Sequence, residues 1–119
     1  MKYVLMFAGT AEEQEQWEKM PTEQMKAAYA RVGQWFEEHS RSGKIVGGEE
    51  LQGPGTATTV RHRNGKTTVT DGPFIESKEV LGGFAVVEVK DLDEALAMAK
   101  SWPGGNLVEV RPVVQHEAS

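Results

Sequence analysis

The sequence predicts an α+β fold, and three observations lead to this prediction. Short apolar runs are typical of strands, other segments show the three- and four-residue spacing of helices, and Asn64-Gly65 marks a hairpin turn. The resulting order is strand, helix, strand, hairpin, strand, helix, strand. Without the hairpin, this order is the split βαβ pattern of a ferredoxin-like antiparallel sheet with two main helices on one face.

The first part of the chain supplies a strand and two helical segments. The apolar run from Tyr3 to Ala8 predicts a buried strand. Thr10 and Glu13 have the spacing of a capping box, so a short helix should follow from Ala11 to about Lys19. After Pro21, a second helix carries one apolar stripe, formed by Met25, Ala28, Tyr29, Val32, Trp35, Phe36 and His39.

The middle of the chain is rich in strand signals. A strand is expected from Lys44 to Leu51, and its Gly47-Gly48 pair indicates a bulge or the close approach of another backbone. Thr56 to Arg63 and Lys66 to Asp71 should pair as an inserted antiparallel hairpin. Arg61 should then lie opposite Thr68 or a near neighbour.

The last part repeats the pattern of strand, helix and strand. A strand is expected from Gly83 to Lys90, and Asp91 is a good N-cap for the helix that follows. The apolar stripe of that helix comprises Leu92, Ala95, Leu96, Ala99 and Trp102. Leu107 to Val114 is the last expected strand.

Two strands are apolar on both faces, which two helices cannot cover. Residues 3–7 and 84–87 are apolar at successive positions, whereas a strand with one wet face would alternate. Another copy of the same sheet is the simplest cover for the second face. The pattern therefore predicts a homodimer that forms through the sheet face.

Size and composition narrow the class of protein. A chain of 119 residues should form one domain, residues 1–119. The net charge of −5 disfavours broad binding to nucleic acid, and no apolar run is long enough to span a membrane. The absence of cysteine and of a signal peptide fits the cytoplasm. No residue spacing indicates a metal site or a cofactor-binding loop.

The candidate site is the charged turn from Thr70 to Glu79. Asp71 could act as a general base, although an Asp-Gly pair is also an ordinary turn in which the carboxylate bonds to nearby backbone. Lys78 could stabilise negative charge, although solvated surface charge explains such a cluster equally simply. The expected catalytic residues are Asp71 and Lys78, and the expected substrate-binding residues are Arg61, Glu76, Phe74 and Glu79.

Other side chains have simpler explanations than a functional role. His39 at the end of its helix fits a boundary or capping residue better than a catalyst. The basic cluster of Arg61, His62, Arg63 and Lys66 fits a solvated hairpin tip. Several large apolar residues could line a pocket but have spacings typical of a core, namely Met6, Phe7, Trp17, Trp35, Phe36 and Trp102.

The motifs along the chain resemble those of the DGPF-domain proteins, a branch of the YCII-related family. They are Asp71-Gly72-Pro73-Phe74, Glu76-Ser77-Lys78-Glu79, Leu81-Gly82-Gly83-Phe84, Gly47-Gly48-Glu49-Glu50-Leu51, Thr56 to Arg61, Asp91 to Ala95 and Val108 to Val113. Ile75 and Ser77 depart mildly from the family's Ala and Thr. The resemblance implies a dimeric α/β barrel. It also implies a histidine–aspartate pair in the YCII branch proper, for which this chain offers only His39 or His62.

Two functions are compatible with these observations. The first is a cofactor-free dimer that binds a small anionic or aromatic molecule. The resemblance suggests proton abstraction or elimination as its reaction, because some relatives are linked to dehalogenation-type elimination. The second is a non-catalytic regulatory or interaction module. Proteins that resemble this one are often encoded beside, or fused to, alternative sigma factors, which makes a sigma factor the expected partner in that case.

Overall fold

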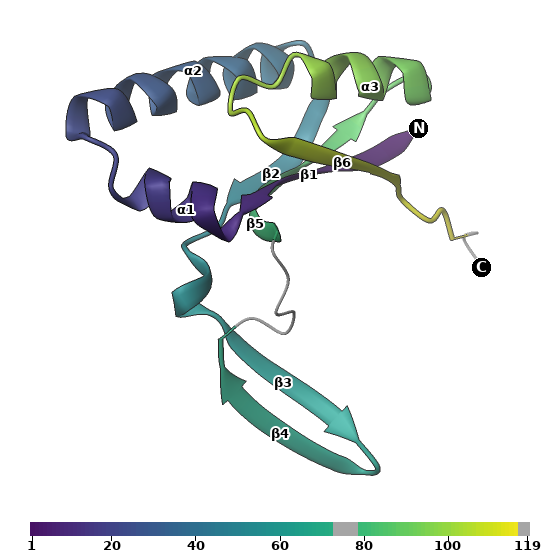
Figure 1. Ribbon diagram of the computed structural model, residues 1–119. Coiled ribbons are helices and arrows are strands. Elements are labelled where there is room, and N and C mark those ends of the chain that lie inside the picture. Colours follow the sequence, from purple (N-terminus) through teal and green to yellow (C-terminus); the bar gives the residue numbers. More distant parts are fainter. Residues whose placement is uncertain (73–78, 117–119) are drawn as a thin grey trace.

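The protein has an α+β fold in which an antiparallel sheet is covered by helices on one side (Figure 1). The computed structural model describes residues 1–72 and 79–116. Within these residues the elements are β1 (Lys2–Thr10), α1 (Ala11–Glu18), α2 (Thr22–Arg41), β2 (Ile45–Glu50), a 3-10 turn (Pro54–Thr56), β3 (Thr58–Arg63), β4 (Lys66–Asp71), β5 (Glu79–Glu88), α3 (Leu92–Lys100) and β6 (Leu107–Pro112).

The main sheet has the strand order β2-β5-β1-β6, and every neighbouring pair is antiparallel. β1 and β5 therefore lie in the centre, and Leu5 of β1 sits between Ala85 of β5 and Val110 of β6. The register of β2 shifts between Ile45 and Gly47. Gly48 then approaches β5 so closely that a Cβ atom would lie 2.4 Å from the carbonyl oxygen of Phe84, which explains the glycine at this position.

The local signals at the element ends are confirmed. The Thr10 hydroxyl accepts a hydrogen bond from the Glu13 N–H at 3.0 Å, and the Glu13 carboxylate accepts one from the Thr10 N–H at 2.9 Å. The Asp91 carboxylate caps α3 by accepting from the Glu94 N–H. Such caps satisfy backbone N–H groups that have no partner inside the helix.

Several strand boundaries differ from expectation. β1 extends from Lys2 to Thr10, β2 is one residue shorter at each end, and β5 ends at Glu88. β5 begins at Glu79, four residues before the expected Gly83, because its first residues pair with the end of β1. β3 begins at Thr58, because the preceding residues Pro54–Thr56 form a 3-10 turn. β6 ends at Pro112, although the Val113 N–H still donates to the carbonyl oxygen of Lys2 at 3.0 Å.

An aromatic cluster joins the helices to the sheet. Phe7 of β1 stacks on Trp102 with ring centroids 3.8 Å apart, and it meets Trp35 of α2 edge-on at 5.8 Å. The Trp35 indole N–H donates to the Ser101 hydroxyl at 2.8 Å, so burial leaves its polar atom satisfied. The buried core comprises Tyr3, Leu5, Phe7, Trp35, Ala85, Val87, Val89, Ala95 and Met98.

The opposite face of the sheet carries apolar side chains that none of the described helices covers. Val4 pairs with Val86 and Met6 pairs with Phe84, and all four side chains are half-buried. Leu81, which pairs with Ala8 on the same face, is 44% exposed. The described strands do not close into a barrel within one chain, because β2 and β6 are opposite edges of the sheet. We call the sheet face that carries Val4, Met6, Leu81, Phe84 and Val86 the open face.

The inserted hairpin is a separate two-stranded sheet that projects from the body, and we call it the arm (β3 and β4, residues 58–71). Arg61 pairs with Thr68 as expected. Asn64 and Gly65 form the turn with φ values of 51° and 74°, the left-handed conformation that tight hairpins require. Figure 1 shows the arm extending from the side of the sheet opposite α2 and α3.

No helix in the described part of the chain is long and apolar enough to cross a membrane.

We predict that Leu5→Ala lowers the free energy of unfolding by about 3 kcal/mol, because it leaves a cavity in the centre of the core. Urea denaturation followed by circular dichroism measures this change. Leu92→Ala is the matched control, because Leu92 is 47% exposed and its truncation should change stability by about 0.5 kcal/mol or less. Equal losses in the two variants would contradict the assigned core.

Candidate functional site

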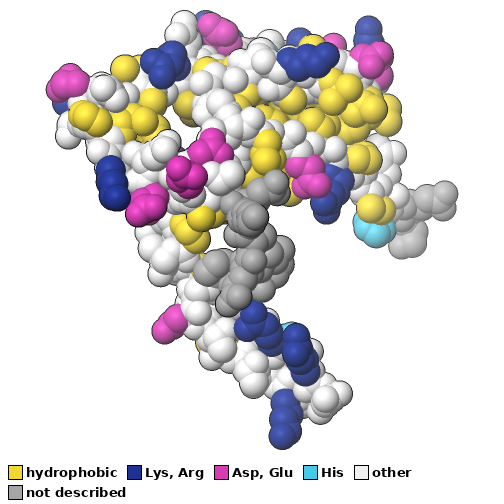
Figure 2. All heavy atoms as spheres, viewed as in Figure 1, with side chains coloured by type: hydrophobic (Ala, Val, Ile, Leu, Met, Phe, Trp, Pro, Cys, Tyr) yellow, Lys and Arg dark blue, Asp and Glu magenta, His cyan; other side chains and the backbone are white. Residues whose placement is uncertain are grey.

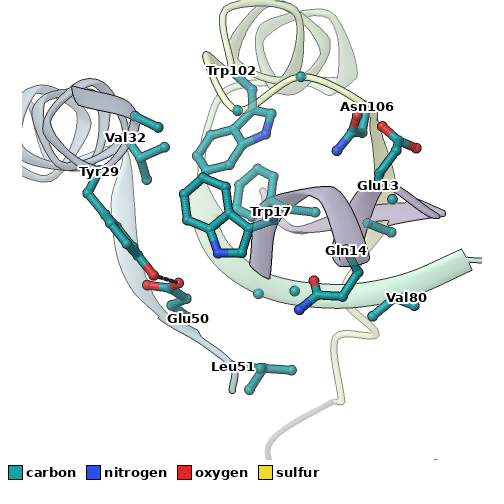
Figure 3. A pocket seen from close by; sticks show the side chains of 18 of the residues that line it. Glu13, Gln14, Trp17, Tyr29, Val32, Glu50, Leu51, Val80, Trp102 and Asn106 are labelled. Carbon is teal, nitrogen blue, oxygen red and sulfur yellow. Dashed lines mark hydrogen bonds between the residues drawn. The ribbon is translucent and has the colours of Figure 1, made fainter. Parts of the chain in front are cut away.

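A cleft of about 1130 Å³ opens between the helices and the sheet. One wall is formed by α1 and α2, another by the ends of β2 and β5, and a third by the loop from Trp102 to Asn106 (Figure 3). The short α1 is held at this position by the capping box at Thr10, where β1 ends. The cleft is large enough for a small molecule of the size that proteins commonly bind.

Aromatic side chains give the cleft its apolar walls. Trp17 of α1 projects into the space beside Tyr29 of α2, with the two rings edge-to-face and their centroids 5.2 Å apart. Trp102 forms the facing wall and is fixed from behind by its stacking on Phe7. Phe36 meets the Trp102 ring edge-on at 6.0 Å. Rigid aromatic walls of this kind suit a flat ligand.

The cleft also contains one defined pair of ionisable side chains. The Tyr29 hydroxyl donates to the Glu50 carboxylate at 2.9 Å, which joins α2 to the end of β2 (Figure 3). Burial raises the pKa of Tyr29, and the neighbouring Glu50 raises this pKa further because a tyrosinate would face a carboxylate. Tyr29 therefore stays a hydrogen-bond donor near neutral pH, and Glu50 can still accept from a ligand.

The charged residues around the cleft are mostly acidic. Arg31 is the basic residue that the described part of the chain contributes to the lining. Four acidic residues also line it, namely Glu13, Glu18, Glu49 and Glu50. The Glu13 carboxylate is committed to the helix cap. The lining thus favours a neutral or cationic group over an anion.

Two of the site residues predicted from the sequence, Asp71 and Arg61, lie on the arm. Asp71 is the exposed last residue of β4 and pairs with Thr58. The Arg61 guanidinium donates to the Thr70 hydroxyl at 3.0 Å. Because side chains alternate along a strand, Arg61 and Asp71 point to opposite faces of the arm. Neither residue belongs to the cleft lining of its own chain, so their catalytic and binding roles stay predictions.

The charged turn is described at its two ends, residues 70–72 and the backbone of Glu79. Phe74, Glu76 and Lys78 lie outside the described residues. The backbone of Glu79 begins β5 opposite Thr10, and its side chain is not described. The base of the arm is well defined: the Gly72 N–H donates to the carbonyl oxygen of Ala57 at 2.8 Å.

The histidines lie apart from the cleft. The His39 ring contacts Trp35 with centroids 4.7 Å apart, and burial and Lys44 lower its pKa. His62 is on the arm, where its Nδ1 lies 3.1 Å from the Thr67 hydroxyl. Within the described ranges, no group of three or more His, Asp or Glu side chains could hold a metal ion.

The cleft residues were only partly visible in the sequence. The sequence offers Trp17, Phe36 and Trp102 as possible pocket residues, but their spacing favours a core. The missed pair is Tyr29 and Glu50, which are 21 residues apart in the chain. One signal was available: Trp17 is a large aromatic residue on the otherwise polar helix AEEQEQWE, so it has no apolar stripe to join.

Comparison with known proteins finds similarity across almost the whole chain. The family model of the YCII-related domain matches residues 1–117. An uncharacterised protein of Rhizobium meliloti (strain 1021) is 33% identical over 105 residues, which cover 85% of this chain and 82% of that protein.

We predict that Glu50→Gln lowers the pKa of Tyr29 towards its ordinary value, because the repulsion between tyrosinate and carboxylate is removed. An ultraviolet titration of tyrosinate measures this, with Tyr29→Phe separating Tyr29 from the chain's other tyrosine, Tyr3. The raised pKa contributes stability below the ordinary tyrosine pKa, and this contribution is lost as pH rises through the folded-state pKa.

Glu49→Gln is the control for this titration. Glu49 neighbours Glu50 in sequence but points to the open face, opposite Phe84. Its replacement should leave the Tyr29 titration unchanged. A Tyr29 pKa that is the same in the wild type and in Glu50→Gln would contradict the pairing.

Proposed function

The chain belongs to the YCII-related domain family, and from that premise we propose that it is a small homodimer that binds an aromatic molecule in the cleft between α1, α2 and the sheet. The observation that carries the proposal is the cleft itself. Its walls hold Trp17, Phe36 and Trp102, and its one defined polar pair is Tyr29 with Glu50. A mostly apolar cavity with few oriented polar groups is typical of small-molecule sites.

The proposed assembly is a ferredoxin-like fold that pairs through the open face into a dimeric α/β barrel. The strand order β2-β5-β1-β6, with helices following β1 and β5, supports the ferredoxin-like part. The uncovered side chains of Met6, Phe84 and Leu81 support the pairing, because a second sheet would remove them from water.

The lining narrows the ligand to a neutral or cationic aromatic molecule. An anion would face the carboxylates of Glu18 and Glu50 across a partly desolvated space, which raises the cost of binding it. A ligand N–H group can instead donate to Glu50 while its ring contacts Trp17 and Trp102. Of the two kinds of ligand expected from the sequence, anionic or aromatic, the cleft therefore favours an aromatic molecule without negative charge.

Cofactor-free proton abstraction or elimination is proposed on weaker support. Glu50 is the carboxylate best placed to act as a base, since it lies in the cleft and holds Tyr29 as a nearby donor. Asp71, with Lys78 and Arg61 stabilising negative charge, is the alternative set. For Asp71 and Arg61, this role requires the arm to approach a ligand held by another copy, since neither lines the cleft of its own chain.

We predict that benzamidine and benzamide bind more tightly than benzoate, because the acidic lining of the cleft disfavours an anion. The three probes have similar shapes and differ mainly in charge. Quenching of tryptophan fluorescence at neutral pH measures binding. Trp17→Leu should abolish the saturable signal, because it removes one aromatic wall while leaving the buried core intact. Glu50→Gln should reduce the preference for benzamidine over benzamide.

The opposite order of affinity, or binding that Trp17→Leu does not change, would contradict the proposed ligand site. Failure of all three probes, together with specific binding of a sigma factor, would instead favour the regulatory module. Leu92→Ala is the control for nonspecific effects, because Leu92 is not part of the cleft lining.

A further inference from the structure

The arm has the properties of an element that requires a partner. A two-stranded hairpin is at best marginally stable alone in water. Val60 and Val69 pair across the arm on one face, yet they are 52% and 65% exposed. The radius of gyration is 16.5 Å, whereas a compact chain of this length has about 13.5 Å. The described part of one chain therefore leaves Val60 and Val69 exposed.

The tip of the arm concentrates positive charge. Arg63 and Lys66 lie directly opposite each other at the turn, and like charges in this position repel. With Arg61 they form the group of dark-blue side chains on the arm in Figure 2. The arm carries three basic residues and one acidic residue, a net charge of +2, so the rest of the chain carries −7. A negative surface would relieve the repulsion at the tip.

The matching negative surface is on the body of the same protein. Glu18 and Glu49 are exposed residues at the border of the cleft, with the Glu49 side chain on the open-face side of β2, and we call them the acidic rim. Neither is in an ion pair among the described residues. Six-residue strands are about 20 Å long, so the tip of the arm lies far from the loop at which the arm joins its own cleft. The tip and the rim are therefore placed to meet between two copies.

The direction of the arm fits such a contact. It extends from the side of the sheet that the open face occupies (Figure 1). Two sheets packed face to face are about 10 Å apart, so an arm about 20 Å long passes the level of the facing sheet. The arm is therefore long enough to bring its basic tip towards the cleft side of the second copy.

We propose that the arm of each copy packs along a second copy of this chain, with Arg63 and Lys66 against the acidic rim of that copy's cleft. The inference rests on the proposed homodimer. It adds that each cleft is bordered by residues from the other chain. Val60 and Val69 supply the apolar part of the contact. Arg63 and Lys66 alternate onto the other face of the arm, and their place beside the turn lets their long side chains supply the charge that fixes the register.

Charge reversal at the tip tests the contact. In 50 mM salt, Arg63→Glu with Lys66→Glu should raise the dimer dissociation constant at least about tenfold, because attraction becomes repulsion at both arms of the dimer. The effect should shrink at high salt. The control is Lys26→Glu with Arg41→Glu, which makes the same change in net charge on the exposed surface of α2. Sedimentation equilibrium measures both constants.

A mixture of complementary variants makes the test specific. The rim variant, Glu18→Lys with Glu49→Lys, should also dimerise weakly by itself. Mixed with the arm variant, it forms heterodimers in which both arms again face opposite charge. Native mass spectrometry should therefore show heterodimers well above the statistical half of all dimers.

Several results would overturn the proposal. One is a dissociation constant equal to that of the control variant, and another is a statistical mixture of dimers. A third is an arm variant that dimerises normally but loses binding to a DNA duplex, which would assign the basic tip to nucleic acid. None of these three results contradicts the proposed dimer through the open face or the proposed ligand site. A monomeric wild type, in contrast, would contradict both the proposed dimer and the proposed arm contact.

Discussion

The structure depends on covering the two faces of its central strands. β1 and β5 place Leu5, Ala85 and Val87 under the helices with no exposure to solvent. The alternate residues of the same strands, Met6 and Phe84 among them, are also apolar and lie on the face away from the described helices. Hydrophobic burial therefore drives both the formation of the core and, in our proposal, the pairing of two chains.

The position of the cleft follows from the way the helices cover the sheet. Trp35 of α2 and Trp102 after α3 both contact Phe7, which brings these helices together over the centre of the sheet. α1 is too short and polar to join that core, and it stands beside the sheet with Trp17 directed into the gap. The gap is closed on the far side by the bond between Tyr29 and Glu50. The packing that makes the core thus leaves an aromatic space next to it.

The sequence was sufficient to predict features that depend on local chemistry. The capping box at Thr10, the cap at Asp91 and the turn at Asn64-Gly65 each involve residues close together in the chain, so their patterns carry the information. The cleft could not be predicted in this way. Glu50 meets Tyr29 only because β2 folds back along β5, and periodicity in α2 cannot report which residue faces Tyr29. Charged residues lie close together in the sequence at the turn that begins with Asp71, whereas the cleft residues are spread along the chain. The sequence pattern therefore indicates the turn and not the cleft.

The solution mass of the protein tests the central claim most directly. If a second copy covers the open face, sedimentation equilibrium at micromolar concentration gives twice the 13.1 kDa mass of one chain. Phe84→Glu should then give a folded single chain, because it places a charge in the proposed interface and spares the core beneath the helices. A monomeric wild type, or a dimer that Phe84→Glu does not weaken, would contradict the account.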